Sequence, residues 1–504
     1  MDVLRKAGGR LRRTVRAVAA AAAVVILGAA ASSGPVAVSE TVASGPARSL
    51  GEPAAAQDSA VSAVVATNFG SAGAQIRAWT RPARSRSWTA AGMLLPDGFG
   101  SSYDPNAAAA PYGPLLVVAG TAPPGESCIT NGSVAIANVS AAGRLGPARL
   151  VSDQRGTGYF DDRPAVAVGP DGTVWVAWSQ GTNADACQNV GPSDQMEVAA
   201  SHDGGRTFSA PVAMPTGAGS SAFGGRLAPL GGGRVAISWT ETMGQGAEAV
   251  LVSVLQRGGQ VSPPHAVLTG QPLPMTLPGA TFYDFPAGDI AALPGGTLVL
   301  AAPFWQSGRG VIALAAARPG GPWRYSAVSP PAQADLLLPA LGVLSPSSVR
   351  LVMAVHTRAG DHLGYDWADL RLPGPGGASG PSGPAPAGLA PLTASPAGPG
   401  YFELGEETSV TQTPTGLLSS FVVAGASGAT LQTVSWTVPK ASPPGHSTPG
   451  TAIAAVIAVI AAVGLLAAWA ARRRVGQRAY ARAPRRPPPR RGGPRESPRS
   501  SSPL

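Results

Sequence analysis

The chain has 504 residues, of which 44% are hydrophobic and 13% are charged, so it is long and apolar enough to bury a large core. Its 66 Gly and 51 Pro favour many turns over long helices. The net charge of +10 suggests a nucleic-acid binder, but the residues before Val18 contribute +5 and those from Arg472 onward +10, which leaves the middle at −5. We therefore expect no nucleic-acid partner.

The N-terminal segment, residues 1–31, is predicted to be a signal peptide. A basic start precedes the apolar run AVAAAAAVVILGAAA, and the small residues Ala29 and Ala31 suit a signal peptidase. Arg12-Arg13 resembles a twin-arginine signal, but the general secretory route is favoured, and an uncleaved anchor is the alternative. Residues 32–58 are expected to form a flexible segment.

Residues 59–439 alternate short apolar runs, such as TVWVAWS and TLVLAAP, with Gly, Pro and Asp turns, which is a strand pattern. Three segments share one order of short strand, Gly/Pro connection, aromatic-acidic cluster and second strand: PARLVSDQRGTGYFDDRPAVAV, PHAVLTGQPLPMTLPGATFYDFPAGDI and APLTASPAGPGYFELGEETSV. The spacing of about 50 to 70 residues is that of propeller blades with four strands each. The pattern predicts that the first unit lacks an inner strand and the last unit an outer one. The sequence predicts an all-β propeller of six or seven blades, with seven favoured.

Aromatic and acidic clusters lead into the expected inner strands, whose starts converge on the central channel of a propeller. Aromatic faces beside carboxylates suit carbohydrate or other polar ligands, whereas the alternative is that the rings wedge blades apart and the Asp residues cap turns. The candidate ligand-binding residues are Tyr103, Asp104, Tyr159, Asp161, Asp162, Arg163, Arg226, Tyr283, Asp284, Tyr401 and Glu403, with Phe160 beside them.

The two cysteines, Cys128 and Cys187, are predicted to form a disulfide bond. Each follows the acidic residue of its unit, Asp104 or Asp161, at a similar distance, which places both in loops between second and third strands of adjacent blades. An external compartment favours oxidation, and the flanking sequences are polar. Two free buried thiols are the alternative.

The stretch SHDGGRTFSAPV packs Ser, Asp and two Gly before an aromatic residue. It resembles the Asp-box, the S-x-D-x-G-x-x-W turn of sialidases and other Asp-box (BNR) repeat proteins, with Ser201, Asp203 and Gly205 matching and Phe208 at the Trp position. Eroded copies are ARPGGPW, residues 317–323, and RPARSRSW, residues 81–88. The resemblance implies a structural turn between the third and fourth strands of a blade, opposite the catalytic face.

A working sialidase, as the resemblance implies, needs three arginines for the substrate carboxylate, a Tyr nucleophile with a Glu, and an acid/base Asp. This chain has no F/Y-R-I-P start, and no third Arg accompanies Arg163 and Arg226 at an equivalent place. The five His show no metal-ligand spacing, and no nucleophile elbow or phosphate loop is present. We expect no metal and no cofactor, assign no catalytic residue, and favour a protein that is not an enzyme.

The C-terminal part is predicted to anchor the protein in a membrane. After a linker, residues 440–450, the uncharged run 451–471 is long enough to span a bilayer, and Arg472-Arg473-Arg474 follows at once. The basic, Pro/Arg-rich tail 472–504 is expected to be cytoplasmic and disordered. The composition is typical of a bacterial protein.

The sequence thus favours a single-pass plasma-membrane protein whose external propeller binds a glycan or a surface protein. The first alternative is an exo-sialidase-like glycoside hydrolase. The second is a sensor that signals through the span, although the tail offers no catalytic domain.

Overall fold

A computed structural model describes residues 37–46, 50–70, 73–109, 114–125, 131–182, 195–216, 221–243, 246–274, 276–280, 287–372, 385–386, 390–391, 408–425 and 428–437. The chain divides into two compact units, Met1–Pro439 and Lys440–Leu504. Within the described ranges, no helix has both the length and the apolar character that crossing a membrane requires. The predicted signal peptide, linker, span and tail lie outside these ranges.

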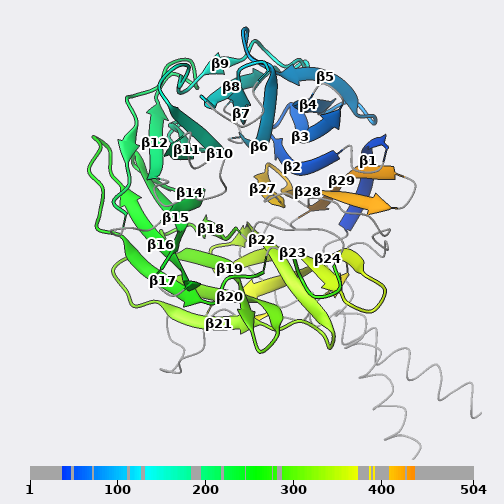
Figure 1. The fold of residues 1–504 in the computed structure, drawn as a ribbon, viewed down its shortest axis with the longest axis vertical. Helices are drawn as coiled ribbons and strands as arrows, with labels where there is room; N and C mark the ends of the chain where they lie inside the picture. The colour runs from blue at the N-terminus through cyan, green and yellow to red at the C-terminus, as the bar shows by residue number, and fades with distance from the viewer. Residues whose placement is uncertain are drawn as a thin grey trace, which may run out of the picture. The chain divides into compact units, whose positions relative to one another are not determined.

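The first unit is an all-β propeller of seven sheets, which confirms the predicted fold class and the favoured blade number (Figure 1). The strands of each sheet are antiparallel, and the first strand of each blade faces the centre of the ring, as Figure 1 shows for β2, β6, β10 and β14. We number the blades 1 to 7 from the sheet that begins with β2.

The first three blades follow one another directly along the chain. Blade 1 holds β2 (Leu50–Gln57), β3 (Val61–Gly70), β4 (Gly73–Pro82) and β5 (Thr89–Leu94). Blade 2 holds β6 (Ser101–Ala109), β7 (Leu115–Ala122), β8 (Ser133–Val139) and β9 (Arg149–Leu150). Blade 3 holds β10 (Tyr159–Val168), β11 (Val174–Thr182), β12 (Gln195–Ser201) and β13 (Val212–Ala213).

The remaining four blades include the one that closes the ring. Blade 4 holds β14 (Ala222–Gly231), β15 (Arg234–Thr242), β16 (Glu248–Leu255) and β17 (His265–Gly270). Blade 5 holds β18 (Asp289–Ala292), β19 (Leu298–Gln306), β20 (Arg309–Ala317) and β21 (Arg324–Val328). Blade 6 holds β22 (Ala334–Ser345), β23 (Ser348–Thr357), β24 (His362–Arg371), β25 (Ala385–Pro386) and β26 (Ala390–Pro391). Blade 7 holds β27 (Ser409–Thr413), β28 (Gly416–Gly425), β29 (Gly428–Thr437) and β1 (Ala37–Gly45).

The core lies between the blades, because the middle strands of each sheet are buried on both faces. In β11, for example, Val174, Val176 and Trp178 pack toward blade 2, while Trp175 and Ala177 pack toward blade 4. This explains why these strands read as continuous apolar runs rather than as an alternation of apolar and polar residues.

The start of the propeller differs from the sequence prediction. Residues 32–58 were expected to be flexible, with the propeller beginning at 59, but β1 and β2 occupy most of that range. The strand β2, LGEPAAAQ, is the inner strand that the first unit was predicted to lack. It was missed because its small Ala residues do not match a strand pattern based on large apolar side chains. The missing outer strand of the last unit is confirmed, since β1 from the N-terminal side supplies it.

The turn at Asp203 is held by its own hydrogen bonds. It joins β12 to β13, and the carboxylate of Asp203 accepts backbone N–H groups from Arg206 at 2.9 Å and Thr207 at 3.0 Å. Gly204 and Gly205 have φ angles of +76° and +81°, which favour glycine. The ring of Phe208 packs against the core between blades 2 and 3. The eroded copies at 81–88 and 317–323 also connect third and fourth strands.

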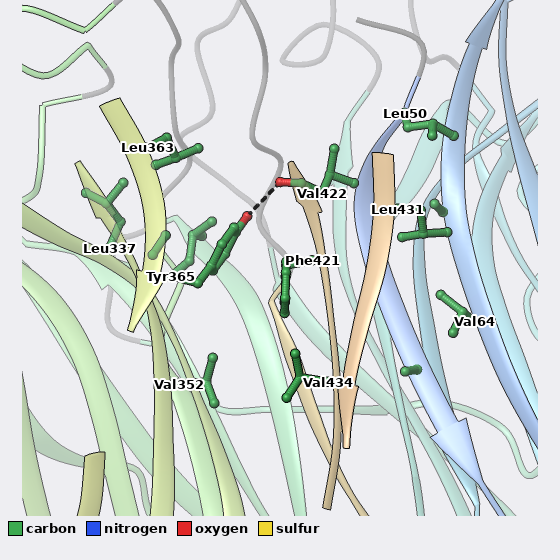
Figure 2. Packing of buried hydrophobic residues seen from close by; sticks show 14 of the residues in the cluster. Leu50, Val64, Leu337, Val352, Leu363, Tyr365, Phe421, Val422, Leu431 and Val434 are labelled. Carbon is green, nitrogen blue, oxygen red and sulfur yellow. Dashed lines mark hydrogen bonds between the residues drawn. The ribbon is translucent and has the colours of Figure 1, made fainter. Parts of the chain in front are cut away.

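Blade 7 contacts blade 6 through aromatic packing. The rings of Tyr365 on β24 and Phe421 on β28 stack with centroids 4.7 Å apart, and the Tyr365 hydroxyl donates to the carbonyl of Val422 at 3.3 Å (Figure 2). Stacked aromatic pairs add about 0.5–1.5 kcal/mol beyond the area they bury. This contact joins the blade that contains the first strand of the propeller to its neighbour.

Arg350 on β23 is fully buried in the same interface. Its guanidinium forms two hydrogen bonds to the carboxylate of Asp369, at 2.7 and 2.9 Å, and lies 4.0 Å from the ring centre of Trp367 and 5.0 Å from that of Trp436. Trp436 belongs to β29, so one cation contacts both blades. A delocalised, weakly hydrated guanidinium suits such a site better than an ammonium.

We predict that Arg350→Ala lowers the free energy of unfolding by about 2–4 kcal/mol, because it removes a fully buried side chain, breaks its ion pair with part-exposed Asp369 and opens a cavity between two Trp rings. Equilibrium urea unfolding measures the change. Arg206→Ala, an exposed residue in the Asp203 turn, is the control and should stay within about 0.5 kcal/mol of the parent. Equal stability of the two variants would contradict the role given to Arg350.

Candidate functional site

The central channel holds a cavity of about 430 Å³, lined by residues of all seven inner strands. Much of its wall is Ala, for example Ala107, Ala167 and Ala228, and these small side chains leave the space open. Among the lining residues that the structure describes, the charged ones are Arg226 on β14 and Asp289 on β18. The size lies in the range of sites for small molecules.

Several inner strands bend sharply before they line the cavity. The register of the first two strands shifts at Gly51/Ala54, Tyr103/Asn106, Asp162/Ala165, Phe223/Arg226 and Leu337/Ala340. One residue of each bulge has a left-handed backbone, with φ between +44° and +67°: Glu52, Asp104, Arg163, Gly224 and Leu338. A strained conformation repeated at one level of the ring shows that the bulge is a built feature, which turns the strands toward the channel.

In each inner strand we define one capping position. It is the residue that directly follows the bulge or, in a strand without a register shift, the residue at the equivalent place. Its seven members are Ala54, Asn106, Ala165, Arg226, Asp289, Ala340 and Ser409, which pair with equivalent residues of the second strands. Three of them accept a hydrogen bond from a backbone N–H of the next blade: Asn106 from Val166 at 3.2 Å, Asp289 from Leu341 at 2.7 Å and Ser409 from Ala55 at 2.9 Å. These bonds tie neighbouring blades together at the channel wall.

Two of the predicted site residues serve the packing of blades 2 and 3. Tyr103 is buried, and its hydroxyl donates to the carbonyl of Asp161 at 3.3 Å. The Asp161 side chain is fully buried and accepts hydrogen bonds from Gln180 at 3.0 Å and Gln154 at 3.2 Å. Burial raises the pKa of Asp161, and these hydrogen bonds oppose the rise. Neither side chain lines the cavity.

Three further predicted residues lie at the start of β10. Tyr159 is 46% exposed. Asp162 and Arg163 are each about one-fifth exposed, with 3.9 Å between carboxylate and guanidinium, and Arg163 lies 5.4 Å from the ring centre of Phe223 on blade 4. Asp162 and Arg163 thus form a small polar pair where blades 3 and 4 meet.

The structure therefore separates the predicted residues into different environments. Arg226 lines the cavity. Asp104 lies in the bulge of β6, where its N–H donates to Glu52 at 3.2 Å. Glu52 is buried and was missed from the sequence, although Glu52-Pro53 repeats the acidic-Pro pair Asp104-Pro105. The predictions for Tyr283, Asp284, Tyr401 and Glu403, and for the bond between Cys128 and Cys187, fall outside the described residues.

A second polar cluster lies in blade 6. Asp335, at the start of β22, is fully buried and contacts His356 Nδ1 at 3.3 Å and Arg358 Nη2 at 2.7 Å, while His356 Nε2 lies 3.1 Å from Asp361. Although burial raises the pKa of Asp335, hydrogen bonds from His356 and Arg358 hold it below its usual range. The cluster fixes the loop between β23 and β24, and it does not line the cavity.

Two glutamates, buried Glu197 on β12 and half-buried Glu248 on β16, have raised pKa values. Burial raises the pKa of Glu197 on β12 to about 7, and the nearby charge of Asp161 adds to the rise. Burial likewise raises the pKa of Glu248 on β16 to about 7. Carboxyl groups with such pKa values can act as general acids when a substrate reaches them, but these two lie away from the cavity lining.

No protein-family model matches the chain, and it matches no curated protein. Solved structures similar to it include a protein of unknown function from Dyadobacter fermentans, with 13% identity and a TM-score of 0.45 over 68% of this chain and 97% of that one. An ulvan lyase of polysaccharide lyase family PL25 shares 12% identity, with a TM-score of 0.48 over 79% and 95%. The Hadza microbial sialidase Hz136 shares 12% identity, with a TM-score of 0.42 over 60% and 63%.

We predict that the stability of the propeller falls as the pH rises from about 4.5 to 7, because folded Glu197 holds its proton over a range in which unfolded Glu197 has lost it. The variant Glu197→Gln stays neutral, so it should be more stable than the parent at pH 8 by on the order of 2 kcal/mol and similar to it at pH 4. Thermal melts at both pH values measure this. Asp97→Asn, at an exposed site, controls for the lost charge, and an equal gain there would contradict the prediction.

Proposed function

We propose that this protein is a single-pass membrane protein whose external β-propeller binds a carbohydrate or protein ligand at its central channel without catalysing a reaction. The observation that carries the proposal is the channel cavity, which is open, lined mainly by small residues and equipped with one cation and one carboxylate in its described wall. An open space with a few fixed polar groups is the usual form of a ligand site.

The chemistry of the cavity supports binding over hydrolysis. Most glycosidases need two carboxyl groups that flank the scissile bond. Asp289 is the carboxylate among the described lining residues, and both of its oxygens accept backbone N–H groups, from Ile290 at 2.8 Å and Leu341 at 2.7 Å. Because both oxygens are engaged by the backbone, this carboxylate suits a structural role.

Arg226 gives the cavity its ligand-facing charge. It occupies the capping position of blade 4, where its Nη1 donates to the carbonyl of Gly225 at 3.1 Å, and its planar guanidinium has the geometry that matches the oxygen pairs of carboxylates and vicinal hydroxyls. A sialidase-like hydrolase would also use such an arginine. The presence of Arg226 therefore does not distinguish a binding protein from a hydrolase, and an activity assay is needed to do so.

The membrane part of the proposal rests on the sequence. The run 451–471 has no charged residue, and three Arg follow it directly. Together with the apolar N-terminal run, this places the propeller outside and the tail inside.

We expect the full-length chain, purified in detergent, to bind a subset of glycans on an array. Arg226→Ala should weaken binding about tenfold or more, because a charge-assisted hydrogen bond is lost. Asp203→Ala, in a turn on the opposite face, should lower the melting temperature and leave affinity unchanged. Turnover of a fluorogenic sialoside by the parent chain would establish the hydrolase instead, and binding of no glycan and no surface protein would refute the proposal.

The predicted topology is tested on intact cells. Protease added outside should remove the region around Ala200 and spare a tag placed after Leu504. Loss of the tag would place the C-terminus outside and contradict the orientation.

A further inference from the structure

Among the strands that the structure describes, the innermost ones pair with no strand on their channel side, so alternate residues direct a backbone N–H and C=O into the channel. At one height along the channel, the residues that direct these groups inward are the ones that directly follow the capping positions. We call this level the edge ring: Ala55, Ala107, Val166, Leu227, Ile290, Leu341 and Val410. The N–H groups of Ala55, Val166 and Leu341 donate to side chains of the preceding blade and not to their own sheet. This shows that the N–H groups at this level point away from their own sheet.

Four of the seven N–H groups of the edge ring are satisfied by the protein. Three are those of Ala55, Val166 and Leu341, and the fourth, that of Ile290, donates to Asp289 Oδ1 at 2.8 Å. In the described part of the chain, no acceptor receives the N–H groups of Ala107, Leu227 and Val410.

The pattern follows from the residue at the capping position of the preceding blade. For Ala107, Leu227 and Val410, the capping residue of the preceding blade is an alanine, and a methyl group accepts no hydrogen bond. These alanines are Ala54, Ala165 and Ala340, respectively. Where the capping position holds Asn106, Asp289 or Ser409, the N–H of the next blade is bound. The three open N–H groups therefore result from three Ala residues at one structurally equivalent position.

An open backbone N–H in a cavity of this size is completed by water or by a ligand. Each open position offers both a donor and a carbonyl acceptor, and a hydroxyl group both accepts and donates. The three positions lie on blades 2, 4 and 7, so they approach the channel from different sides. A single sugar ring, with hydroxyls around its rim, meets groups placed in this way.

We infer that the three open positions of the edge ring, at Ala107, Leu227 and Val410, bind the hydroxyl groups of one sugar residue seated in the channel cavity. This rests on the proposed function and narrows it from any carbohydrate or protein to a polyhydroxylated ring that is held by backbone groups. Ala54, Ala165 and Ala340 are then specificity-determining positions, because they leave the donors open.

The test closes the open donors one at a time with Ala54→Ser, Ala165→Ser and Ala340→Ser, which copy the Ser409 cap. The probes are D-galactose, D-glucose and N-acetyl-D-glucosamine, titrated into the full-length chain in detergent and followed by amide chemical shifts and saturation-transfer NMR. At least one sugar should shift the amides of Ala107, Leu227 and Val410. Each Ser variant should weaken the affinity for that sugar about two- to tenfold, which is the loss expected for one hydrogen bond. The melting temperature of each variant should stay the same or rise.

Ala167→Ser is the matched control. It adds the same hydroxyl to the same cavity wall, but the equivalent residue of the next blade is Pro229, which has no N–H to cap. Its affinity should equal that of the parent. Because Ala54, Ala165 and Ala340 are buried, Ser409→Ala provides a variant without added volume: it opens the N–H of Ala55, so sugar affinity should stay equal or rise.

The outcomes separate this inference from the proposed function. Glycan binding on an array that is unchanged in all three Ser variants would overturn the edge-ring site and leave a glycan-binding propeller in place. Equal loss in Ala167→Ser would show that crowding, not capping, is responsible, and would also overturn it. If no sugar shifts the three amides, the open groups hold water only and the inference fails. Absence of any glycan binding by the parent would overturn the inference and leave a protein as the proposed ligand, whereas binding of neither a glycan nor a surface protein would remove the proposed function as well.

Discussion

Closure of the ring is the constraint on which the rest of the propeller depends. β1, at the beginning of the described chain, pairs with β29 at its end, from Ala37 opposite Trp436 to Gly45 opposite Ala429. Glu40 of β1 also accepts from Trp88 Nε1 at 3.3 Å and forms an ion pair with Arg81, so the same strand is tied to blade 1. Contacts between such distant parts of the chain carry a high entropic cost. Trp436, which lies opposite Ala37 in this pair, also packs against Arg350 of blade 6, so the closing sheet is held on both sides.

A closed ring creates a second constraint, because it turns seven unpaired strand edges toward one channel. Buried backbone groups must be paired or hydrated, and here the blades partly solve this for one another: Asn106, Asp289 and Ser409 each bind an N–H of the next blade. The caps hold the inner strands in register across blade boundaries. They also occupy edge groups that the proposed ligand would need, so under that proposal the stability of the ring and binding in the channel compete for the same atoms.

Much of this architecture could be predicted from the sequence because it is local. Strand runs such as TVWVAWS and the turn at Asp203 are determined by neighbouring residues, and both are found where the patterns placed them. β1 and β2 were missed because one is polar and largely exposed and the other depends on small Ala residues. The burial of Tyr103 and Asp161 could not be predicted either, since it arises from contact between blades 2 and 3 and not from the GYFDD cluster itself.

The cavity shows why a search for reactive side chains finds only part of such a site. Arg226 was identified because guanidinium chemistry is visible in a sequence, whereas Ala54, Ala165 and Ala340 carry no functional group at all. Their importance emerges only when the ring places them beside Asn106, Asp289 and Ser409, which do cap the next blade. A position that could stabilise the fold with a hydroxyl but holds a methyl group breaks a local rule, and such breaks concentrate where function competes with stability. In this propeller, Ala at three capping positions leaves three edge groups of the channel wall outside the hydrogen bonds that hold the blades together.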